Sequence, residues 1–248
     1  MKLECVFLPW RSLALNLAAE EYLLRVKEKN EKIIYLFFYE NFDSIVLGKT
    51  LDIKKEIYEY KNHPNVLRRI SGGGSVVHFH GNLNYAVFIS LKAHPELFDV
   101  KKSYEFILSA LITGLNDLLF LSQKGLSDLS LKQRGSLRKI SGNSQSRKMG
   151  WILHHGTFLY HKTNLNKISY FLKHPPKEPQ YRNGRSHSEF MPLTLSVWSK
   201  NKIIKGIIKG FSKVFLAPVK RMEYHEFFNK NDINEIRKLT LKNYMYLK

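Results

Sequence analysis

Apolar side chains recur along this chain at two kinds of spacing, one typical of helices and the other of strands. Leu13, Leu17 and Leu24 fall near one face of a helix, and Ser12 just before them is a residue that caps helices. Other stretches of the chain also carry apolar residues at three- and four-residue intervals, which is the spacing typical of a helix. Helices are predicted over residues 13–29, 54–61, 101–121, 164–173, 200–217 and 223–247.

Apolar runs and alternating polar and apolar residues predict the strands. The predicted strands cover residues 33–39, 44–48, 84–91, 126–132, 137–145 and 149–160. The first two are joined by ENFD, whose Asn and Asp suit a turn, so we expect a hairpin. Residues 174–192 carry several prolines, which predicts an irregular basic loop. With no repeat or linker in the pattern, residues 1–248 are expected to form a single domain in which residues 200–248 are closing helices.

The composition is that of a globular protein with a large core, since 44% of the 248 residues are hydrophobic. The first residues include Glu4, Pro9 and Arg11 where a signal peptide needs an apolar run, and no stretch approaches a membrane span. Cys5 is the single cysteine, which excludes an internal disulfide and is expected to be a small buried hydrophobe. We therefore expect a soluble, cytoplasmic protein.

The chain is strongly basic, with 40 Lys and Arg against 21 Asp and Glu and a formal net charge of +19. Such a charge attracts nucleic acid, anionic membrane or an acidic protein partner. The basic residues are scattered, and no segment has the uninterrupted basic run of a nucleic-acid-binding tail. The net charge alone does not choose among these partners. A general bias of the composition toward lysine explains much of the net charge equally well.

The stretch RRISGGGSVVHFHGNLNYAVF, which begins at Arg68, concentrates residues able to bind a ligand. Gly72, Gly73 and Gly74 remove every Cβ from one face of a turn, so backbone N–H groups can approach an anion or a flat ligand. Arg68 and Arg69 stand upstream, where guanidinium groups can meet phosphate or carboxylate oxygens. A triple glycine is more often a plain loop, and this one matches neither a Walker loop nor a dinucleotide fingerprint.

Two further clusters, RKISGNSQ and HHGT, add a lysine on a predicted strand, two histidines, and small hydroxyl and amide groups. Together with the glycine stretch they suit a site for an adenylated acid. Lys139 could hold an ammonium group near an α-phosphate and stabilise the charge that develops during adenylation. The alternative for such a lysine is a solvated position on a strand.

The clusters RRxSGGGxVxH, GNxN, KxSG and HHGT, in this order, resemble those of the lipoate protein ligase A family within the biotin and lipoate ligases. The resemblance spans nearly the whole chain. It implies an α+β fold similar to class II aminoacyl-tRNA synthetases and biotin ligases, with a mixed, mainly antiparallel sheet flanked by helices. It also implies that lipoate is activated with ATP to lipoyl-AMP and transferred to a lysine of a lipoyl carrier domain.

The resemblance further implies which residues act. Lys139 would be the catalytic residue that contacts the carboxyl and phosphoryl oxygens of the acyl-adenylate. Asp128 is a candidate ligand for Mg²⁺ at the nucleotide phosphates, so ATP, Mg²⁺ and lipoate are the expected cofactors and substrate. The residues implied to bind the lipoyl group or the acyl-adenylate are Arg69, Ser71, Gly72, Gly73, Gly74, His78, Asn82, Asn84, Ser141, Gly142, His155, Gly156 and Thr157.

The partners implied by the resemblance are acidic lipoyl carrier domains of 2-oxoacid dehydrogenase complexes or the glycine-cleavage H protein. A positive surface would steer such domains toward the site, whereas membrane and nucleic acid are not expected partners. Ligases of this family often carry an additional C-terminal domain, which a single-domain form lacks. We therefore expect either a separate accessory subunit or a minimal form of the enzyme.

The chain departs from the family pattern at three places. Lys49 to Asp52 follow Gly48 where the family has Arg-Asn-Gln-Asn, Phe79 stands where the family has an aspartate, and Ser127 replaces an asparagine. These changes leave open whether the acyl group is lipoate or octanoate.

Other functions fit parts of the sequence. An octanoyl or lipoyl transferase of the same fold could pass the acyl chain through an acyl-cysteine, but Cys5 is far in sequence from the motifs. A transferase that acts on preformed lipoyl-adenylate needs no cysteine. Biotin ligation is disfavoured because the Gly-Arg-Gly-Arg loop is absent. A non-catalytic protein that binds nucleic acid or lipoate would leave the Lys139 cluster unexplained.

Overall fold

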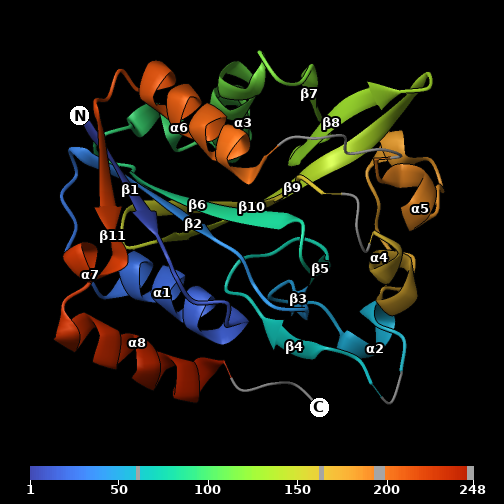
Figure 1. Ribbon diagram of the computed structural model, residues 1–248, viewed down its shortest axis with the longest axis horizontal. Helices are drawn as coiled ribbons and strands as arrows, with labels where there is room; N and C mark the ends of the chain where they lie inside the picture. Colours follow the sequence, from blue (N-terminus) through green and yellow to red (C-terminus); the bar gives the residue numbers. More distant parts are fainter. Residues whose placement is uncertain (60–61, 162–164, 193–198, 245–248) are drawn as a thin grey trace.

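The computed structural model describes residues 1–59, 62–161, 165–192 and 199–244. An eight-stranded sheet runs through the middle of Figure 1, with the strand order β11-β1-β2-β6-β10-β9-β8-β7. β1 is parallel to β2 and β11, and the other neighbours are antiparallel, so the expected mixed, mainly antiparallel sheet is confirmed. These strands are β1 (Lys2–Phe7), β2 (Ile33–Tyr39), β6 (Asn82–Ser90), β7 (Leu121–Lys124), β8 (Asp128–Gln133), β9 (Ser136–Lys148), β10 (Trp151–Leu159) and β11 (Val219–Glu223).

A second, three-stranded sheet in the order β4-β3-β5 comprises β3 (Ser44–Leu47), β4 (Asn65–Arg68) and β5 (Val76–His78). The predicted hairpin between the second and third strands is wrong, because β2 and β3 belong to different sheets. β2 already pairs with β1 on one side and β6 on the other, so β3 finds its partners elsewhere. Residues 69–75, which join β4 to β5, are called the glycine turn below.

Helices cover both faces of the large sheet (Figure 1). α3 (Val100–Leu115) and α6 (Lys200–Val214) lie on one face, and α1 (Leu13–Arg25) and α8 (Lys230–Asn243) lie on the other. Each pair encloses an apolar core against the sheet, one built around side chains such as Phe211 and the other around Phe37. Removal of these two apolar faces from water is the main force that holds the three layers together.

Several predicted boundaries shift in the structure. Ser12 caps the first helix as expected, but that helix ends at Arg25. The helix predicted over 101–121 ends at Leu115, and β7 follows it. Part of the region predicted as closing helices is instead β11, because the edge of β1 takes it as a parallel partner. The predicted helix over 200–217 matches α6, and that over 223–247 divides into α7 (Tyr224–Phe227) and α8, with its residues 245–247 outside the described residues.

Two short helices, α2 (Ile53–Glu56) and α4 (Asn166–Phe171), lie near the small sheet, and α5 (His187–Phe190) lies beside α4 and β9 (Figure 1). Two 3₁₀ helices are η1 (Pro95–Leu97) and η2 (Gln180–Arg182). The expectation of an irregular loop over 174–192 is therefore wrong in part, since a capping box starts α5 there. Residues 60–61 and 164 of two predicted helices are not among the described residues. In the described part of the chain, no helix is long and apolar enough to cross a membrane.

Candidate active site

Arg69 holds the glycine turn in shape from inside. Its guanidinium group is buried, and Nε donates to Ser71 Oγ at 3.0 Å while Nη2 donates to the Gly74 carbonyl at 2.8 Å. The Gly72 carbonyl accepts from the same guanidinium (3.1 Å from Nε) and from the Ser144 hydroxyl at 2.8 Å. Burial lowers the pKa of Arg69 to about 10, so the group stays charged at neutral pH. The predicted role of Arg69 in contacting a ligand thus comes with a second task, which is to order the turn.

The small sheet brings the glycine turn against the segment that follows β3. A Cβ at Gly48 would lie 2.0 Å from the Gly73 carbonyl oxygen, so only glycine allows this approach. Gly73 itself has φ +84°, a conformation that favours glycine. The sequence predicts that Arg68 can contact a ligand. In the structure its Nη1 instead donates to the carbonyls of Gly48 (2.9 Å) and Leu51 (2.7 Å). Arg68 therefore fixes the loop that departs from the family pattern.

A β-bulge places Lys139 beside Asp128. Along β8 and β9, Asp128 lies opposite Gly142 and Ser130 lies opposite Lys139, which leaves Ile140 as the extra residue. Side chains alternate between the two faces of a strand, so one extra residue brings Lys139 to the face that also carries Asp128. Lys139 Nζ lies 2.9 Å from Asp128 Oδ1. Gly142 leaves room for this, because a Cβ there would lie 2.8 Å from Lys139 Cε.

Asp128 has a second partner on the segment predicted to be an irregular loop. The hydroxyl of Tyr181, on η2, donates to Asp128 Oδ2 at 2.8 Å. Both carboxylate oxygens are therefore engaged, one by an ammonium group and one by a phenol. Among the described residues no group of three or more His, Cys, Asp or Glu side chains could hold a metal ion. Asp128 stays a predicted magnesium ligand.

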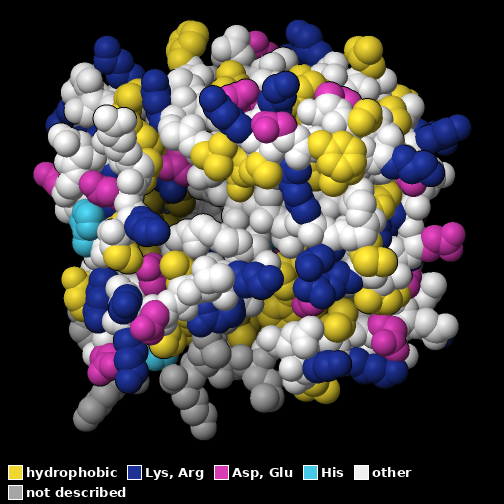
Figure 2. Space-filling model, turned by 180° about the vertical axis from the view of Figure 1, so that it is seen from behind, with side chains coloured by type: hydrophobic (Ala, Val, Ile, Leu, Met, Phe, Trp, Pro, Cys, Tyr) yellow, Lys and Arg dark blue, Asp and Glu magenta, His cyan; other side chains and the backbone are white. Residues whose placement is uncertain are grey.

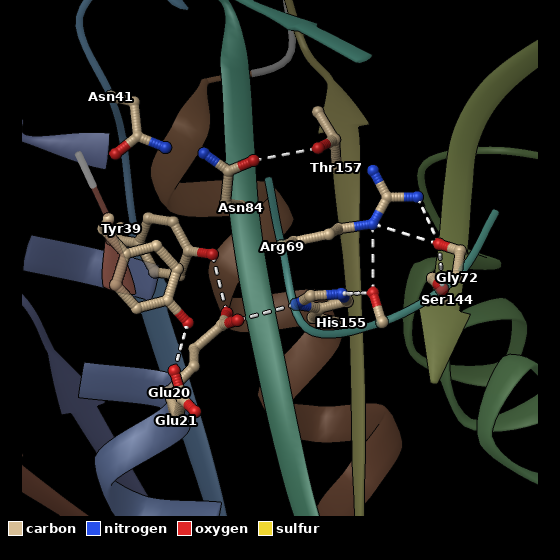
Figure 3. A network of polar contacts seen from close by, with 12 residues as sticks. Glu20, Glu21, Tyr39, Asn41, Arg69, Gly72, Asn84, Ser144, His155 and Thr157 are labelled. Carbon is tan, nitrogen blue, oxygen red and sulfur yellow. Dashed lines mark hydrogen bonds and ion pairs between the residues drawn. The ribbon is translucent and has the colours of Figure 1, made fainter. Parts of the chain in front are cut away.

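A chain of hydrogen bonds connects the histidine of the glycine motif to the next strands. The Asn41 amide donates to His78 Nδ1 at 2.8 Å, so the Nε2–H of His78 donates to Thr157 Oγ1 at 3.2 Å. The Thr157 hydroxyl then donates to Asn84 Oδ1 at 2.9 Å (Figure 3). Burial, with a smaller contribution from the charge of Arg69, lowers the pKa of His78 to about 3. His78 is therefore a neutral, fixed group at neutral pH.

A buried glutamate from α1 completes the site, and sequence reasoning missed it. Glu20 accepts from the Tyr39 hydroxyl at 2.6 Å and lies 2.7 Å from His155 Nδ1 (Figure 3). His155 Nε2 lies 2.6 Å from Ser71 Oγ, so the chain of contacts ends on the glycine turn. The available signal was a pair of glutamates within an apolar, alanine-rich helix, because a buried carboxylate needs buried partners. Tyr39 and Asn41 carried no comparable signal.

Gly156 and Ser141 lie next to an ordered amide on β9. A Cβ at Gly156 would lie 2.0 Å from Asn143 Oδ1, which accepts from the buried Tyr85 hydroxyl. The Asn143 amide nitrogen in turn approaches Ser141 Oγ at 3.4 Å. Gly156 is thus required by packing within the sheet.

Two cavities of about 240 and 120 Å³ meet at the Lys139–Asp128 pair. The larger lies between β8, β9 and residues 173–191, on the side of the molecule that Figure 2 shows hollowed. The smaller lies against the glycine turn and β10. Residues that line both are Gly74, Ser75, Val76, Ser127, Asp128, Lys139, Gly142 and Thr157.

Most of the predicted site residues therefore come together. The smaller cavity is also lined by Arg69, Gly73, His78, Asn84, His155 and Gly156, and the larger by Asn82 and Ser141. Ser71 and Gly72 shape the turn behind the cavity wall. Two buried atoms, Asn84 Nδ2 and Asn82 Oδ1, have no hydrogen-bond partner among the described residues, which suits groups that face a ligand.

Two other residues of interest lie outside both cavity linings. Cys5 is buried in β1, and burial raises the pKa of its thiol to about 12. The expectation that Cys5 is a small buried side chain is confirmed. Phe79, which stands where the family has an aspartate, is fully buried in an apolar core.

Comparison with known proteins gives a family match over much of the chain. Residues 12–194 match the model of the lipoyl protein ligase A/B catalytic domain. Lipoate-protein ligase 1 of Staphylococcus aureus is 32% identical over 211 residues, which cover 81% of this chain and 61% of that protein. Three curated relatives are matched over 42%, 61% and 47% of their own lengths, so the chain spans about half of each.

Two solved structures share the fold. One is a bi-partite lipoate protein ligase of Thermoplasma acidophilum, described with its E2 lipoyl domain, with a TM-score of 0.74, 22% identity and coverage of 97% of this chain and 92% of that one. The other is a lipoate-protein ligase A bound with ATP, with a TM-score of 0.75, 21% identity and coverage of 98% and 95%. The expected fold class is thereby confirmed.

Proposed function

This chain belongs to the lipoyl protein ligase A/B catalytic domain family, and from that premise we propose that it is a lipoate-protein ligase. In the proposed reaction, ATP activates lipoate to lipoyl-AMP, and the lipoyl group then passes to a lysine of a lipoyl carrier domain. Residues 1–248 would act as one catalytic domain. The observation that carries the proposal is the position of Lys139 where two cavities meet, because the reaction must join two substrates at one point.

In the first step the lipoate carboxylate would lie in the smaller cavity and ATP in the larger. A carboxylate oxygen attacks the α-phosphorus, the bond to the bridging oxygen breaks, and pyrophosphate leaves with the electron pair. The ammonium group of Lys139 would stabilise the negative charge on the α-phosphate during this attack. Its bond to Asp128 holds it at the junction before the substrates arrive.

The acyl group would lie against bare backbone. A Cβ at Gly74 would meet nothing within 4 Å, so the missing side chain leaves open space on the cavity side of the turn. The hydrogen bonds of His78 to Thr157 and of His155 to Ser71 keep the opposite walls in fixed orientations. A site ordered before binding loses less entropy when the substrate is bound.

Mg²⁺ would be held by Asp128 together with the nucleotide phosphates. One carboxylate fits this ion, because Mg²⁺ in nucleotide sites keeps several waters and takes most other ligands from phosphate oxygens. When bound, the ion would neutralise phosphate charge. Lys139, whose Nζ lies 2.9 Å from Asp128 Oδ1, would then lie beside the same phosphates.

The second substrate would be an acidic lipoyl carrier domain. Lys and Arg side chains are spread over the face shown in Figure 2, in keeping with the net charge of +19. Such a surface attracts an acidic domain and raises the rate of encounter. The neutral amine of the acceptor lysine would attack the carbonyl carbon of lipoyl-AMP and lose a proton to solvent, and the bond from that carbon to the phosphate oxygen would break as AMP leaves with the electron pair. Carrier domains of 2-oxoacid dehydrogenase complexes and the glycine-cleavage H protein are the proposed acceptors.

A transferase that uses preformed lipoyl-adenylate is the second candidate, because the structure gives no reason for a cysteine route. The Cys5 thiol is protonated at neutral pH and lies outside both cavities. One solved relative is described as bi-partite, so an accessory subunit for the adenylation step is part of this proposal.

Mass spectrometry of an apo lipoyl domain tests both candidates. The protein is incubated with the domain and either ATP, Mg²⁺ and lipoate, or synthetic lipoyl-adenylate. We expect a lipoyl adduct from both donors and its loss in Lys139→Ala. Lys132→Ala is the matched control, because Lys132 is exposed on β8 and lines neither cavity. An adduct from the adenylate alone would select the transferase, and no adduct from either donor would refute both.

A further inference from the structure

We propose that Arg182 binds the pyrophosphate part of ATP. The η2 segment, which carries Arg182, would therefore make the site bind ATP in preference to AMP. This inference rests on the proposed function, because it assigns a role within the same nucleotide site. Arg182 lines the larger cavity, and neither the glycine motif nor the Lys139 cluster points to it.

The guanidinium group of Arg182 is buried but only partly paired. The residue is 4% exposed. Its Nε donates to the Arg185 carbonyl at 2.9 Å and lies 3.2 Å from Glu178 Oε2. The guanidinium carbon Cζ lies 5.0 Å from the centre of the Phe190 ring. Within the described residues Nη2 has no hydrogen-bond partner. A buried donor without an acceptor is costly, so the geometry calls for an acceptor that the protein does not supply.

Neighbouring contacts hold Arg182 close to the reacting groups. Tyr181, the preceding residue, donates to Asp128, which in turn holds Lys139. Arg185 donates to the Leu137 carbonyl at 2.7 Å and so ties the same segment to β9. The segment that carries Arg182 is thus anchored at both ends to the strands that form the cavity floor.

Positive charge collects around this cavity. Besides Arg182 and Lys139, its lining includes three further lysines, Lys124, Lys173 and Lys177, against two carboxylates, while Glu178 pairs with Arg182 from outside the lining. Of the two carboxylates in the lining, Glu56 accepts from the Ser75 hydroxyl and Asp128 is paired with Lys139. His187 also lines the cavity. The pKa of His187 is lowered by burial and further by the charges of Arg182, His174 and Lys139. A ligand with several negative charges would relieve this repulsion.

The chemistry of adenylation assigns the place of each cation. Lys139 lies at the junction with the acyl cavity, so it is positioned for the α-phosphate, where the new bond forms. Arg182 is contributed to the larger cavity by η2, whereas Lys139 is contributed by β9. There it would meet the β- and γ-phosphates, on which charge grows as the bridging bond breaks. A guanidinium fork can donate two parallel hydrogen bonds to such oxygens.

Binding of ATP and of AMP, measured by titration calorimetry with Mg²⁺, tests the proposal without turnover. In Arg182→Ala we expect the Kd for ATP to rise by about 10- to 100-fold, as for loss of a charge-assisted pair, and the Kd for AMP to change less than about 2-fold. Arg182→Lys keeps the charge without the fork and should fall between. Lys132→Ala should bind both nucleotides as the unaltered protein does.

Transfer from synthetic lipoyl-adenylate separates this inference from the proposed function. The adenylate lacks pyrophosphate, so Arg182→Ala should transfer its lipoyl group at a rate close to that of the unaltered protein. An unchanged ratio of ATP to AMP affinity would overturn the role of Arg182 while transfer by the unaltered protein keeps the proposed function. Equal loss of both nucleotides and of transfer in Arg182→Ala and Arg182→Lys would also overturn it, since Arg182 would then only hold the segment in place.

Discussion

Replacing Gly142 by alanine should displace Lys139 without unfolding the protein. The new Cβ would lie 2.8 Å from Lys139 Cε and 2.9 Å from Nζ, whereas ordinary van der Waals contact begins at 3.4 Å. Cε must therefore retreat by about 0.6 Å and Nζ by about 0.5 Å. The obstacle is the end of a flexible side chain rather than backbone, so the lysine yields and the strand does not.

The expected cost falls on activity rather than on stability. A retreat of this size weakens the contact between Lys139 and the buried Asp128 without breaking it, at a cost of about 1 kcal/mol, because the lysine end is partly exposed. Alanine in place of glycine within a strand returns about 0.5–1 kcal/mol, and Gly142 is not among the residues with positive φ. The free energy of unfolding should therefore change little. A displacement of this size at the reacting atoms lowers the rate by about 10- to 100-fold.

Initial rates of lipoyl transfer, followed by mass spectrometry, and urea unfolding together test this reasoning. Lys139→Ala sets the lower limit of activity, and Ser136→Ala, an exposed position on the same strand, serves as the control. The activity of Gly142→Ala should approach that of Lys139→Ala, and its unfolding free energy should approach that of Ser136→Ala. Full activity in Gly142→Ala would show that the position of Lys139 does not matter. A loss of more than about 3 kcal/mol of unfolding free energy would show that the clash is relieved by the backbone instead.

Three further results are expected. Gly48→Ala should destabilise the protein by about 1–3 kcal/mol in urea unfolding, because its Cβ would lie 2.0 Å from the Gly73 carbonyl oxygen, and an unchanged midpoint would contradict the close approach. Cys5→Ala should keep full lipoyl transfer, and the native thiol, with its pKa near 12, should resist alkylation at pH 8 when followed by mass spectrometry. Burial lowers the pKa of His78 and His154 to about 3, so only the unfolded state takes up these protons between about pH 6.5 and 3. Unfolding free energy should fall as pH decreases through that window, by up to about 1.4 kcal/mol per pH unit per histidine, and His154→Gln should reduce the slope.

The local pattern of the sequence was enough for most strands, but it was not enough for their pairing. The predicted strand over 33–39 matches β2, and that over 149–160 contains β10, because alternating and apolar runs are properties of a few neighbouring residues. The predicted hairpin between β2 and β3 is wrong because β2 pairs with β1 and β6, which lie far from it in the sequence. β11 was missed since an exposed edge strand has little apolar signal.

The candidate site shows the same division between local and distant information. His78, His155 and Thr157 could be predicted because each lies in a short motif. Glu20 and Arg182 could not, since each reaches the site from an element with no motif of its own. Their roles depend on burial, and burial is set by elements packed against them from elsewhere in the chain.

The spacing of the KxSG motif has a physical explanation in the bulge on β9. Gly142 comes three positions after Lys139, which in a regular strand would place the two residues on opposite faces. The extra residue Ile140 brings both to the face of Asp128, and the lysine then crosses the space that a side chain at Gly142 would fill. Regular pairing with Ile140 retained would turn Lys139 away from the cavity, whereas deletion of Ile140 should remove the bulge and leave Lys139 opposite Ser130, on the face of Asp128. The bulge and the glycine therefore both position the lysine beside Asp128, and a sequence that kept only the lysine would not keep the site.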